Sequence, residues 1–168
     1  MKIRMTLAAL LCSVALVSAQ SLFTATLDGA QDGGGARTGA GFISGSLDGN
    51  VFSFNGTFGG LSGTVNTGGF HIHGPAPAGA STGILYFLYP TMTLNPDNRS
   101  GTMNGSVTLT SQHIDYLEDS LLYFNIHTST FGGGEIRGQI VPVPEPSTWA
   151  LMGFGALGLL WSVRRKKA

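Results

Sequence analysis

The sequence predicts an all-β domain, either a Greek-key β-sandwich or a flattened barrel, and three observations carry that prediction. Apolar and polar residues alternate over many short stretches, as they do in strands with one buried face. Turn residues separate these stretches at intervals of roughly 8 to 12 positions, and 26 of the 168 residues are glycine. About eight such strands fit within roughly 120 residues, the usual size of a sandwich or small barrel.

The expected strands follow one another along the chain with little helix between them. They are predicted at residues 21–27, 42–47, 51–58, 70–73, 84–89, 101–110, 122–127 and 135–141, with a further short segment at 61–65. Asp48-Gly49-Asn50 predicts a tight hairpin between the second and third strands, because Asp-Gly accepts the positive φ angles that such turns need. The apolar run 84–89 predicts a central strand buried on both faces. Residues 91–99 are expected to form a loop.

A change of period predicts one short helix. Ile114, Leu117 and Leu121 recur at helical spacing after Ser111, which is a suitable N-cap. His113 lies on this helix, where we expect its side chain to be solvated.

Three of the four histidines lie on the polar faces of two apolar strands. Phe70 and Ile72 alternate with His71 and His73, and the segment 122–127 repeats the arrangement with His127 on its polar face. Successive side chains of a strand point to opposite faces, so His71 and His73 should project together, away from the core.

Two interpretations of these histidines remain open. Two imidazoles at i and i+2 and a third from another strand can supply three nitrogen ligands to a copper or zinc ion. Alternatively, His71, His73 and His127 join Glu135 and Arg137 in a hydrogen-bonded polar ladder on the sheet surface. The sequence alone does not show whether the two strands are neighbours.

Charge and composition exclude several classes of function. Residues 20–142 hold three arginines and eight acidic residues, a formal charge of −5, and the lack of a basic patch argues against nucleic acid as a partner. The only cysteine, Cys12, precedes this domain, so no disulfide is expected within it. The domain has no Gly-x-Ser-x-Gly elbow and no phosphate-binding loop, and we therefore expect a protein that is not an enzyme.

The two ends of the chain are targeting segments. Residues 1–19 have the basic start, apolar run and small-residue cleavage site of a signal peptide. At the other end, residues 148–163 carry no charge, are flanked by two tryptophans and precede a basic tail at 164–168, which predicts a transmembrane helix with its C-terminus in the cytoplasm. The expected division is therefore signal peptide 1–19, domain 20–142 and C-terminal signal 143–168.

The C-terminal signal resembles the PEP-CTERM sorting signal of Gram-negative bacteria. The resemblance rests on Val143, Pro144, Glu145 and Pro146, followed by the apolar helix and the basic cluster. It implies recognition and cleavage by an exosortase, a membrane peptidase of bacteria that make exopolysaccharide or biofilm matrix. The alternative is a simple membrane anchor.

The domain resembles the CHRD family, named from chordin, through four motifs in the family's order. They are Leu27-Asp28-Gly29-Ala30-Gln31, His71-Ile72-His73-Gly74-Pro75-Ala76, Tyr123-Phe124-Asn125-Ile126-His127-Thr128 and Gly134-Glu135-Ile136-Arg137-Gly138-Gln139-Ile140. Residues 32–37 depart from the family, which usually has proline where this chain has glycines. The strand 70–73 is also similar to the copper-binding His-x-His strand of copper/zinc superoxide dismutases, which implies a superoxide-dismutase-like or immunoglobulin-like fold. Further dismutase ligands and the disulfide are missing.

Together these features predict an exported, non-enzymatic protein of the cell surface or extracellular matrix. Its precursor is anchored transiently in the inner membrane, an exosortase is its processing partner, and exopolysaccharide or other surface proteins are its expected ligands. The alternative is a copper- or zinc-binding extracytoplasmic protein that uses His71, His73 and His127. No other cofactor is expected.

Overall fold

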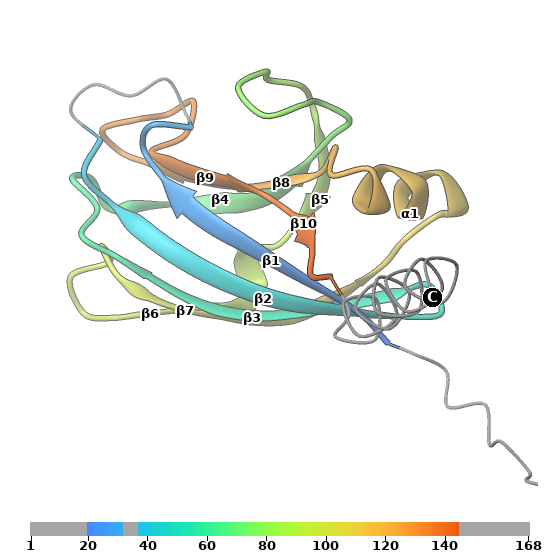
Figure 1. Ribbon diagram of the computed structural model, residues 1–168. Coiled ribbons are helices and arrows are strands. Elements are labelled where there is room, and N and C mark those ends of the chain that lie inside the picture. The colour runs from blue at the N-terminus through green and yellow to red at the C-terminus, as the bar shows by residue number, and fades with distance from the viewer. Residues whose placement is uncertain (1–19, 32–36, 145–168) are drawn as a thin grey trace, which may run out of the picture.

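Alternating apolar side chains build one antiparallel sheet that curls into a half-barrel (Figure 1). The computed structural model describes residues 20–31 and 37–144. Its strands are β1 (Ser21–Asp28), β2 (Ala40–Asp48), β3 (Val51–Gly59), β4 (Val65–His73), β5 (Ile84–Phe87), β6 (Met92–Leu94), β7 (Gly101–Thr108), β8 (Tyr123–Thr128), β9 (Ile136–Gln139) and β10 (Val141–Pro142). The predicted all-β class is confirmed, but the strands form a single curled sheet rather than two stacked sheets.

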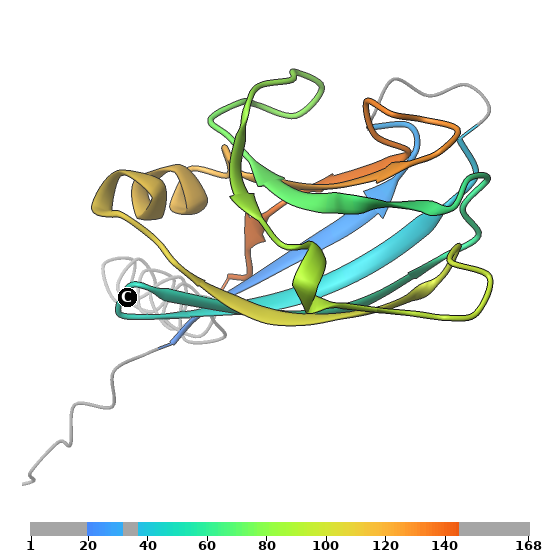
Figure 2. The ribbon, with the colours of Figure 1, turned by 180° about the vertical axis from the view of Figure 1, so that it is seen from behind.

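The strand order across the sheet is β5-β4-β8-β9-β1-β2-β3-β7-β6, and the short β10 pairs with β1. The 3-10 helix η1 (Tyr89–Thr91) joins β5 to β6 along the chain. It therefore links the two edge strands of the curled sheet, as seen from behind in Figure 2.

The core fills the space enclosed by the curl. Five fully or almost fully buried phenylalanines lie at its centre: Phe23, Phe52, Phe54, Phe70 and Phe124. Their ring centroids are 5.4 Å apart for Phe54–Phe124, 5.7 Å for Phe70–Phe124 and 5.8 Å for Phe23–Phe52. Such aromatic pairs each contribute about 0.5–1.5 kcal/mol beyond the burial of their area. The rings come from both halves of the sheet and so hold the halves together.

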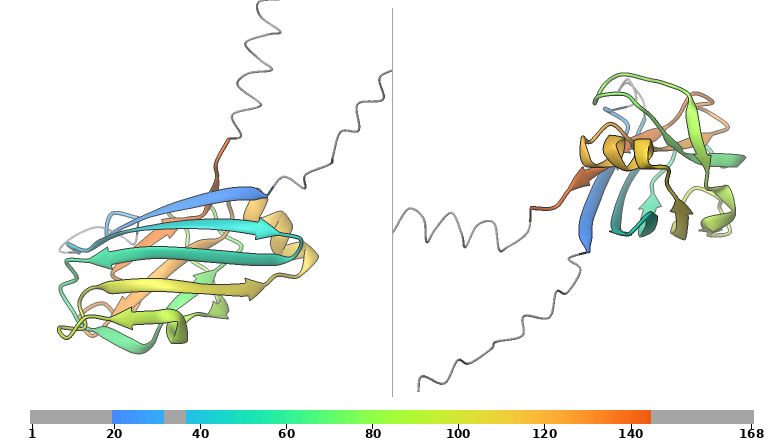
Figure 3. Two further views of the ribbon diagram at one scale, coloured as in Figure 1. Left: turned by 90° about the horizontal axis from the view of Figure 1, so that it is seen from below. Right: turned by 90° about the vertical axis from the view of Figure 1, so that its right-hand side faces the viewer.

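One helix, α1 (Ser111–Glu118), lies at the open end of the curl, as the end view in Figure 3 shows. Its N-cap is Thr110, one residue before the predicted Ser111, and the Thr110 side chain accepts a hydrogen bond from the His113 amide. Leu117 packs in the core with no exposed surface. The predicted helix is thus confirmed, with its end at Glu118 rather than Leu121.

The predicted hairpin is also confirmed, because β2 and β3 pair from Ala40↔Gly59 to Asp48↔Val51 and Gly49 has φ +58°. The prediction for 84–89 is wrong in one respect. This run forms β5, which is an edge strand, with Ile84 and Phe87 exposed. Its apolar residues cover the rim of the core and the side chain of His71 instead of filling a central position.

Two smaller differences concern segments with weak patterns. Residues 92–94 of the predicted loop form β6 beside β7, and of the segment 61–65 only Val65 is in a strand. The predicted signal peptide and the transmembrane helix at 148–163 lie outside the described residues. Within the described ranges no helix is long and apolar enough to cross a membrane.

Candidate metal centre

The central strands β4 and β8 place the histidines. Their register pairs Phe70 with Ile126 and Ile72 with Phe124, and all four of these side chains are buried in the core. The alternating residues therefore project from the opposite face of the sheet, as the sequence predicts. That face carries His71 and His73 of β4 and Tyr123, Asn125 and His127 of β8.

The structure brings the three predicted ligands together. One ligand nitrogen from each of His71, His73 and His127 lies within 4.8 Å of the other two. The ring centroids are 4.9 Å apart for His71–His127, 5.5 Å for His71–His73 and 5.7 Å for His73–His127. In the described part of the chain this is the one group of three or more histidine, cysteine or acidic residues with such spacing.

Two loops cover the cluster, so that it is not an open sheet surface. They are residues 74–83 after β4 and 129–135 after β8, both on the upper side of Figure 1. His71 and His73 are each only 6% exposed as a result. A buried polar group is costly unless it has a hydrogen-bond partner or a metal ion to bind, so the ring nitrogens of these two histidines each need such a partner.

Backbone carbonyls of the same two loops orient two of the rings. His73 Nδ1 lies 3.0 Å from the Thr82 oxygen, and His127 Nδ1 lies 2.9 Å from the Gly132 oxygen. A carbonyl oxygen only accepts, so each Nδ1 carries a proton, and in the neutral form of each ring the lone pair is then on Nε2. Metal-ligating histidines are commonly oriented in this way by their second nitrogen.

His71 has the most perturbed environment of the three. Burial, together with the neighbouring His127 and His73 rings, lowers the pKa of His71 to about 4. The Gly68 backbone opposes this lowering, but neither His71 ring nitrogen makes a hydrogen bond of ordinary geometry within the described residues, and the same is true of His127 Nε2. His71 is therefore neutral at physiological pH, which is the form that binds a metal ion.

Aromatic side chains close the sides of the cluster. The Tyr123 ring stacks on His73 at 5.0 Å and 12°, and the Phe87 ring meets His71 edge-on at 5.0 Å. Phe87 is itself 73% exposed, so it forms the outer wall of the site. The period-2 pattern that located the histidines also put Tyr123 and Asn125 on their face, and it could have identified both residues.

Asn125 is the polar neighbour that the sequence analysis did not single out. It pairs with His71 in the register and is 3% exposed. Its Nδ2 donates to the Gly133 oxygen at 3.3 Å, whereas its Oδ1 is buried with no hydrogen-bond partner within the described residues.

Glu135 does not take part in the polar ladder offered as the second interpretation. Its buried carboxylate accepts hydrogen bonds from the Ser62 amide, from the Gly63 amide at 3.2 Å and from Thr128 Oγ1 at 2.7 Å. Burial alone would raise the pKa of Glu135, but these donors outweigh it and hold the pKa below its ordinary value. Glu135 precedes β9, so strand alternation does not direct its side chain toward the histidines.

Arg137 lies on the histidine face, but its hydrogen bonds are to the loops that follow β1 and β4. Its Nη1 donates to the Ala80 oxygen at 3.1 Å and to Ser81 Oγ at 3.0 Å, and its Nε donates to the Gln31 oxygen. Its guanidinium lies 5.1 Å from the centre of the Tyr123 ring. The fourth histidine, His113, is away from the cluster, and contrary to expectation it is bonded through Nδ1 to the Tyr86 hydroxyl at 2.6 Å.

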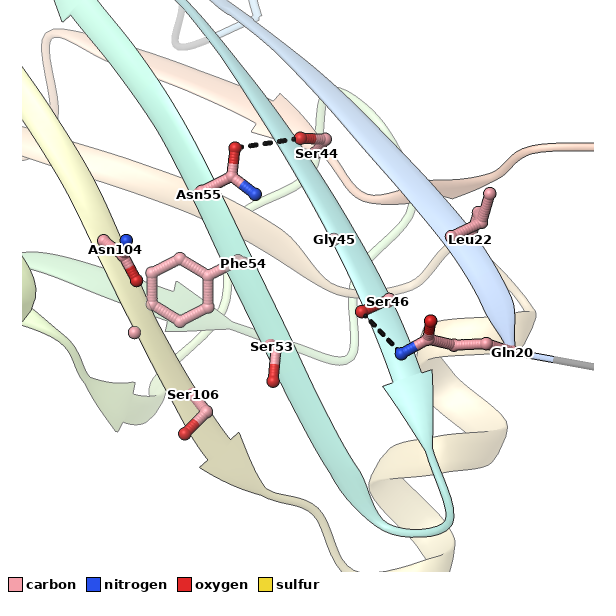
Figure 4. A pocket seen from close by; sticks show the side chains of 11 residues that line it. Gln20, Leu22, Ser44, Gly45, Ser46, Ser53, Phe54, Asn55, Asn104 and Ser106 are labelled. Carbon is pink, nitrogen blue, oxygen red and sulfur yellow. Dashed lines mark hydrogen bonds between the residues drawn. The ribbon is translucent and has the colours of Figure 1, made fainter.

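A second concave feature lies on the outer face of the other half of the sheet. It is a shallow trough of about 570 Å³ across β1, β2, β3 and β7, shown in Figure 4. Its lining carries no charged side chain and includes Gln20, Asn55, Asn104 and four serines. Hydrogen bonds of 3.2 Å from Ser44 to Asn55 and of 3.1 Å from Gln20 to Ser46 run along it.

The predicted sorting motif begins at the end of the domain. The Val143 amide donates to the Leu22 oxygen at 2.8 Å, so the chain leaves the domain beside the start of β1. Val143 and Pro144 are described, whereas Glu145 and Pro146 lie outside the described residues.

Comparison with known proteins agrees with both resemblances. A family model of the CHRD domain matches residues 23–140, and a model of the PEP-CTERM protein-sorting motif matches residues 142–166. Searches of curated proteins and of solved structures each found no match.

Proposed function

The chain belongs to the CHRD domain family and ends in a PEP-CTERM sorting motif, and from this premise we propose a cell-surface protein whose domain binds a transition-metal ion. The sorting motif implies an exported protein that an exosortase recognises. The proposed role is binding rather than catalysis. The observation that carries it is the convergence of three imidazoles, two of them buried, with one ligand nitrogen of each within 4.8 Å of the others.

The chemistry of the donors supports copper or zinc. Imidazole nitrogen is a ligand that both metals accept, with metal–nitrogen distances of about 2.0–2.1 Å for zinc. Ligand nitrogens within 4.8 Å of one another need only small side-chain movements to reach such distances. The carbonyl bonds at Nδ1 of His73 and His127 already turn each ring so that Nε2 is the available donor.

The test is the metal content of the purified full chain after incubation with copper or zinc and removal of unbound ion. We expect one ion per chain in the parent and none in the His71→Ala/His73→Ala variant. His113→Ala is the matched control, since His113 lies outside the cluster, and it should keep its metal. No bound metal in the parent would refute the proposed function.

Sorting is tested separately through the C-terminal motif. Replacing Pro144 and Glu145 by alanine should prevent exosortase processing, so that the precursor accumulates in the inner membrane. Cell fractionation and the intact mass of the protein measure this. Normal release of the variant to the cell surface would contradict the sorting assignment.

A second candidate function is binding of matrix polysaccharide at the trough. Its hydroxyl and amide groups suit the hydroxyls of a neutral sugar, and Phe42, which is 51% exposed, lies beside Thr57 on the adjoining part of the same face. Migration in a gel containing the host exopolysaccharide tests this proposal. Asn55→Ala/Asn104→Ala should abolish any retardation, whereas the His71→Ala/His73→Ala variant should be retarded like the parent.

A further inference from the structure

The ligands of the histidine cluster carry no negative charge. The described part of the chain places neither a carboxylate nor a thiolate in the group of His71, His73 and His127. Glu135 accepts its hydrogen bonds from Ser62, Gly63 and Thr128. A bound ion would therefore keep its full charge inside the site.

That charge would be held in a buried position. His71 and His73 are each 6% exposed, and the rings of Tyr123 and Phe87 cover them. The cost of transferring an ion from water to a medium of low dielectric constant is large, and in the Born description it grows with the square of the charge. An ion of charge +2 therefore pays four times the transfer cost of an ion of charge +1 and equal radius.

The nearest fixed charge in the described part of this face is positive. The cross-strand row runs Phe87, His71, Asn125, Arg137, Asp28, so the guanidinium is two positions from His71 and the Asp28 carboxylate one position further away. Arg137 also lies against Tyr123, whose ring stacks on His73. Repulsion from this cation is proportional to the charge of the bound ion and so disfavours a divalent ion twice as strongly.

The number of ligand nitrogens also disfavours a divalent ion such as Zn²⁺. Zinc in proteins is almost always four-coordinate, so a three-histidine site must add a water molecule or an anion as the fourth ligand. Cu(I) is a closed-shell ion that is stable with three nitrogen ligands in a plane. Asn125 Oδ1, the further buried acceptor beside His71, is neutral and leaves the charge of the ligand set unchanged.

We propose that the site of His71, His73 and His127 selects Cu(I) over Zn²⁺, because it offers three neutral donors in a buried position beside a cation. This inference rests on the proposed metal-binding function and specifies its ion. The protein would then hold reduced copper outside the cytoplasm in a site shielded from solvent.

The experiment compares the two ions on the purified full chain at pH 7. Cu(I) is supplied anaerobically with ascorbate and competed with bicinchoninate, and Zn²⁺ is competed with 4-(2-pyridylazo)resorcinol. We expect one Cu(I) per chain and a dissociation constant at least 100-fold lower than that for Zn²⁺. Equal or tighter Zn²⁺ binding would overturn the inference while leaving the proposed function intact. Binding of neither ion would refute the proposed function itself.

A charge substitution tests the reason for the preference. Asn125→Asp adds a carboxylate next to His71 with almost no change of shape and should reduce the ratio of the two dissociation constants at least tenfold. Asn104→Asp is the matched control, because Asn104 is exposed on β7 in the trough, and its ratio should equal that of the parent. An unchanged ratio in a folded Asn125→Asp protein, verified by circular dichroism, would overturn the electrostatic basis. If that variant does not fold, the comparison of ions on the parent still decides the proposal.

Discussion

Replacing Glu135 by glutamine should cause one of the largest losses of stability that a single polar substitution can produce here. The carboxylate has no exposed surface and joins three parts of the chain. One oxygen accepts the Ser62 amide, and the other accepts the Gly63 amide and the Thr128 hydroxyl. It thereby connects the segment before β4 to the end of β8.

The magnitude follows from those three bonds. Glutamine keeps one acceptor oxygen, so in the best arrangement two bonds survive without their charge and the third is lost. Hydrogen bonds to charged groups contribute about 1.5–3 kcal/mol and neutral ones about 0.5–1.5 kcal/mol. Two weakened bonds and one lost bond therefore cost roughly 3–5 kcal/mol, against a total stability of about 5–15 kcal/mol for most domains.

Thermal and urea unfolding at pH 7 measure the loss. We expect the melting temperature to fall by roughly 10–20 °C, at about 4 °C per kcal/mol for a domain of this size. Glu118→Gln is the matched control, because Glu118 is exposed on α1. The melting temperature of this variant should lie within about 2 °C of that of the parent.

The pH dependence of the stability gives an independent check that the Glu135 carboxylate stabilises the fold in its charged form. The folded pKa of Glu135 lies below its ordinary value of 4.5, so its stabilisation is complete above that value and is lost as the pH falls through the folded pKa. The difference between parent and Glu135→Gln should therefore narrow below pH 4.5. Equal stabilities at pH 7, or a difference that widens in acid, would refute the reasoning.

Three further predictions concern other parts of the domain. Gly56→Ala should destabilise it by about 1–3 kcal/mol in urea, because the new Cβ would lie 2.3 Å from the Phe42 carbonyl oxygen; Gly83→Ala, with open space around it, should be nearly neutral. Thr110→Ala removes the N-cap of α1 and should cost about 0.5–2 kcal/mol by the same assay, and an unchanged midpoint would show that the cap contributes nothing. Metal-free protein should lose up to about 3 kcal/mol between pH 6.5 and pH 4, since the unfolded His71 takes up a proton there and the folded one does not. His71→Leu should remove that part of the pH dependence, and an unaltered profile would contradict it.

Local patterns in the sequence predicted most of the elements. Alternation located the long strands, Asp48-Gly49-Asn50 located the hairpin, and helical spacing located α1. These predictions succeed because side-chain period and turn geometry depend only on neighbours along the chain. The prediction for the run 84–89 was wrong because the position of a strand in a sheet depends on distant parts of the chain. An apolar stretch does not show whether its strand is central or at an edge.

The C-terminal sorting motif and the family were likewise determined by the sequence itself. The motif at 143–146 and the four domain motifs are linear features, and both family models match at those places. The same strand period that set Phe70 and Ile72 in the core sent His71 and His73 to the other face.

Only the tertiary structure decided that His127 joins the other two histidines. That requires β4 and β8 to be neighbours although 49 or more residues separate the paired positions, and no local pattern encodes such a pairing. The same holds for the burial of the cluster, which depends on two loops that fold over it, and for Glu135, two of whose donors, the Ser62 and Gly63 amides, are 73 and 72 residues away in the sequence. A residue's type and period set which way its side chain leaves the strand, but the partners it meets are set by contacts between parts of the chain that are remote in sequence.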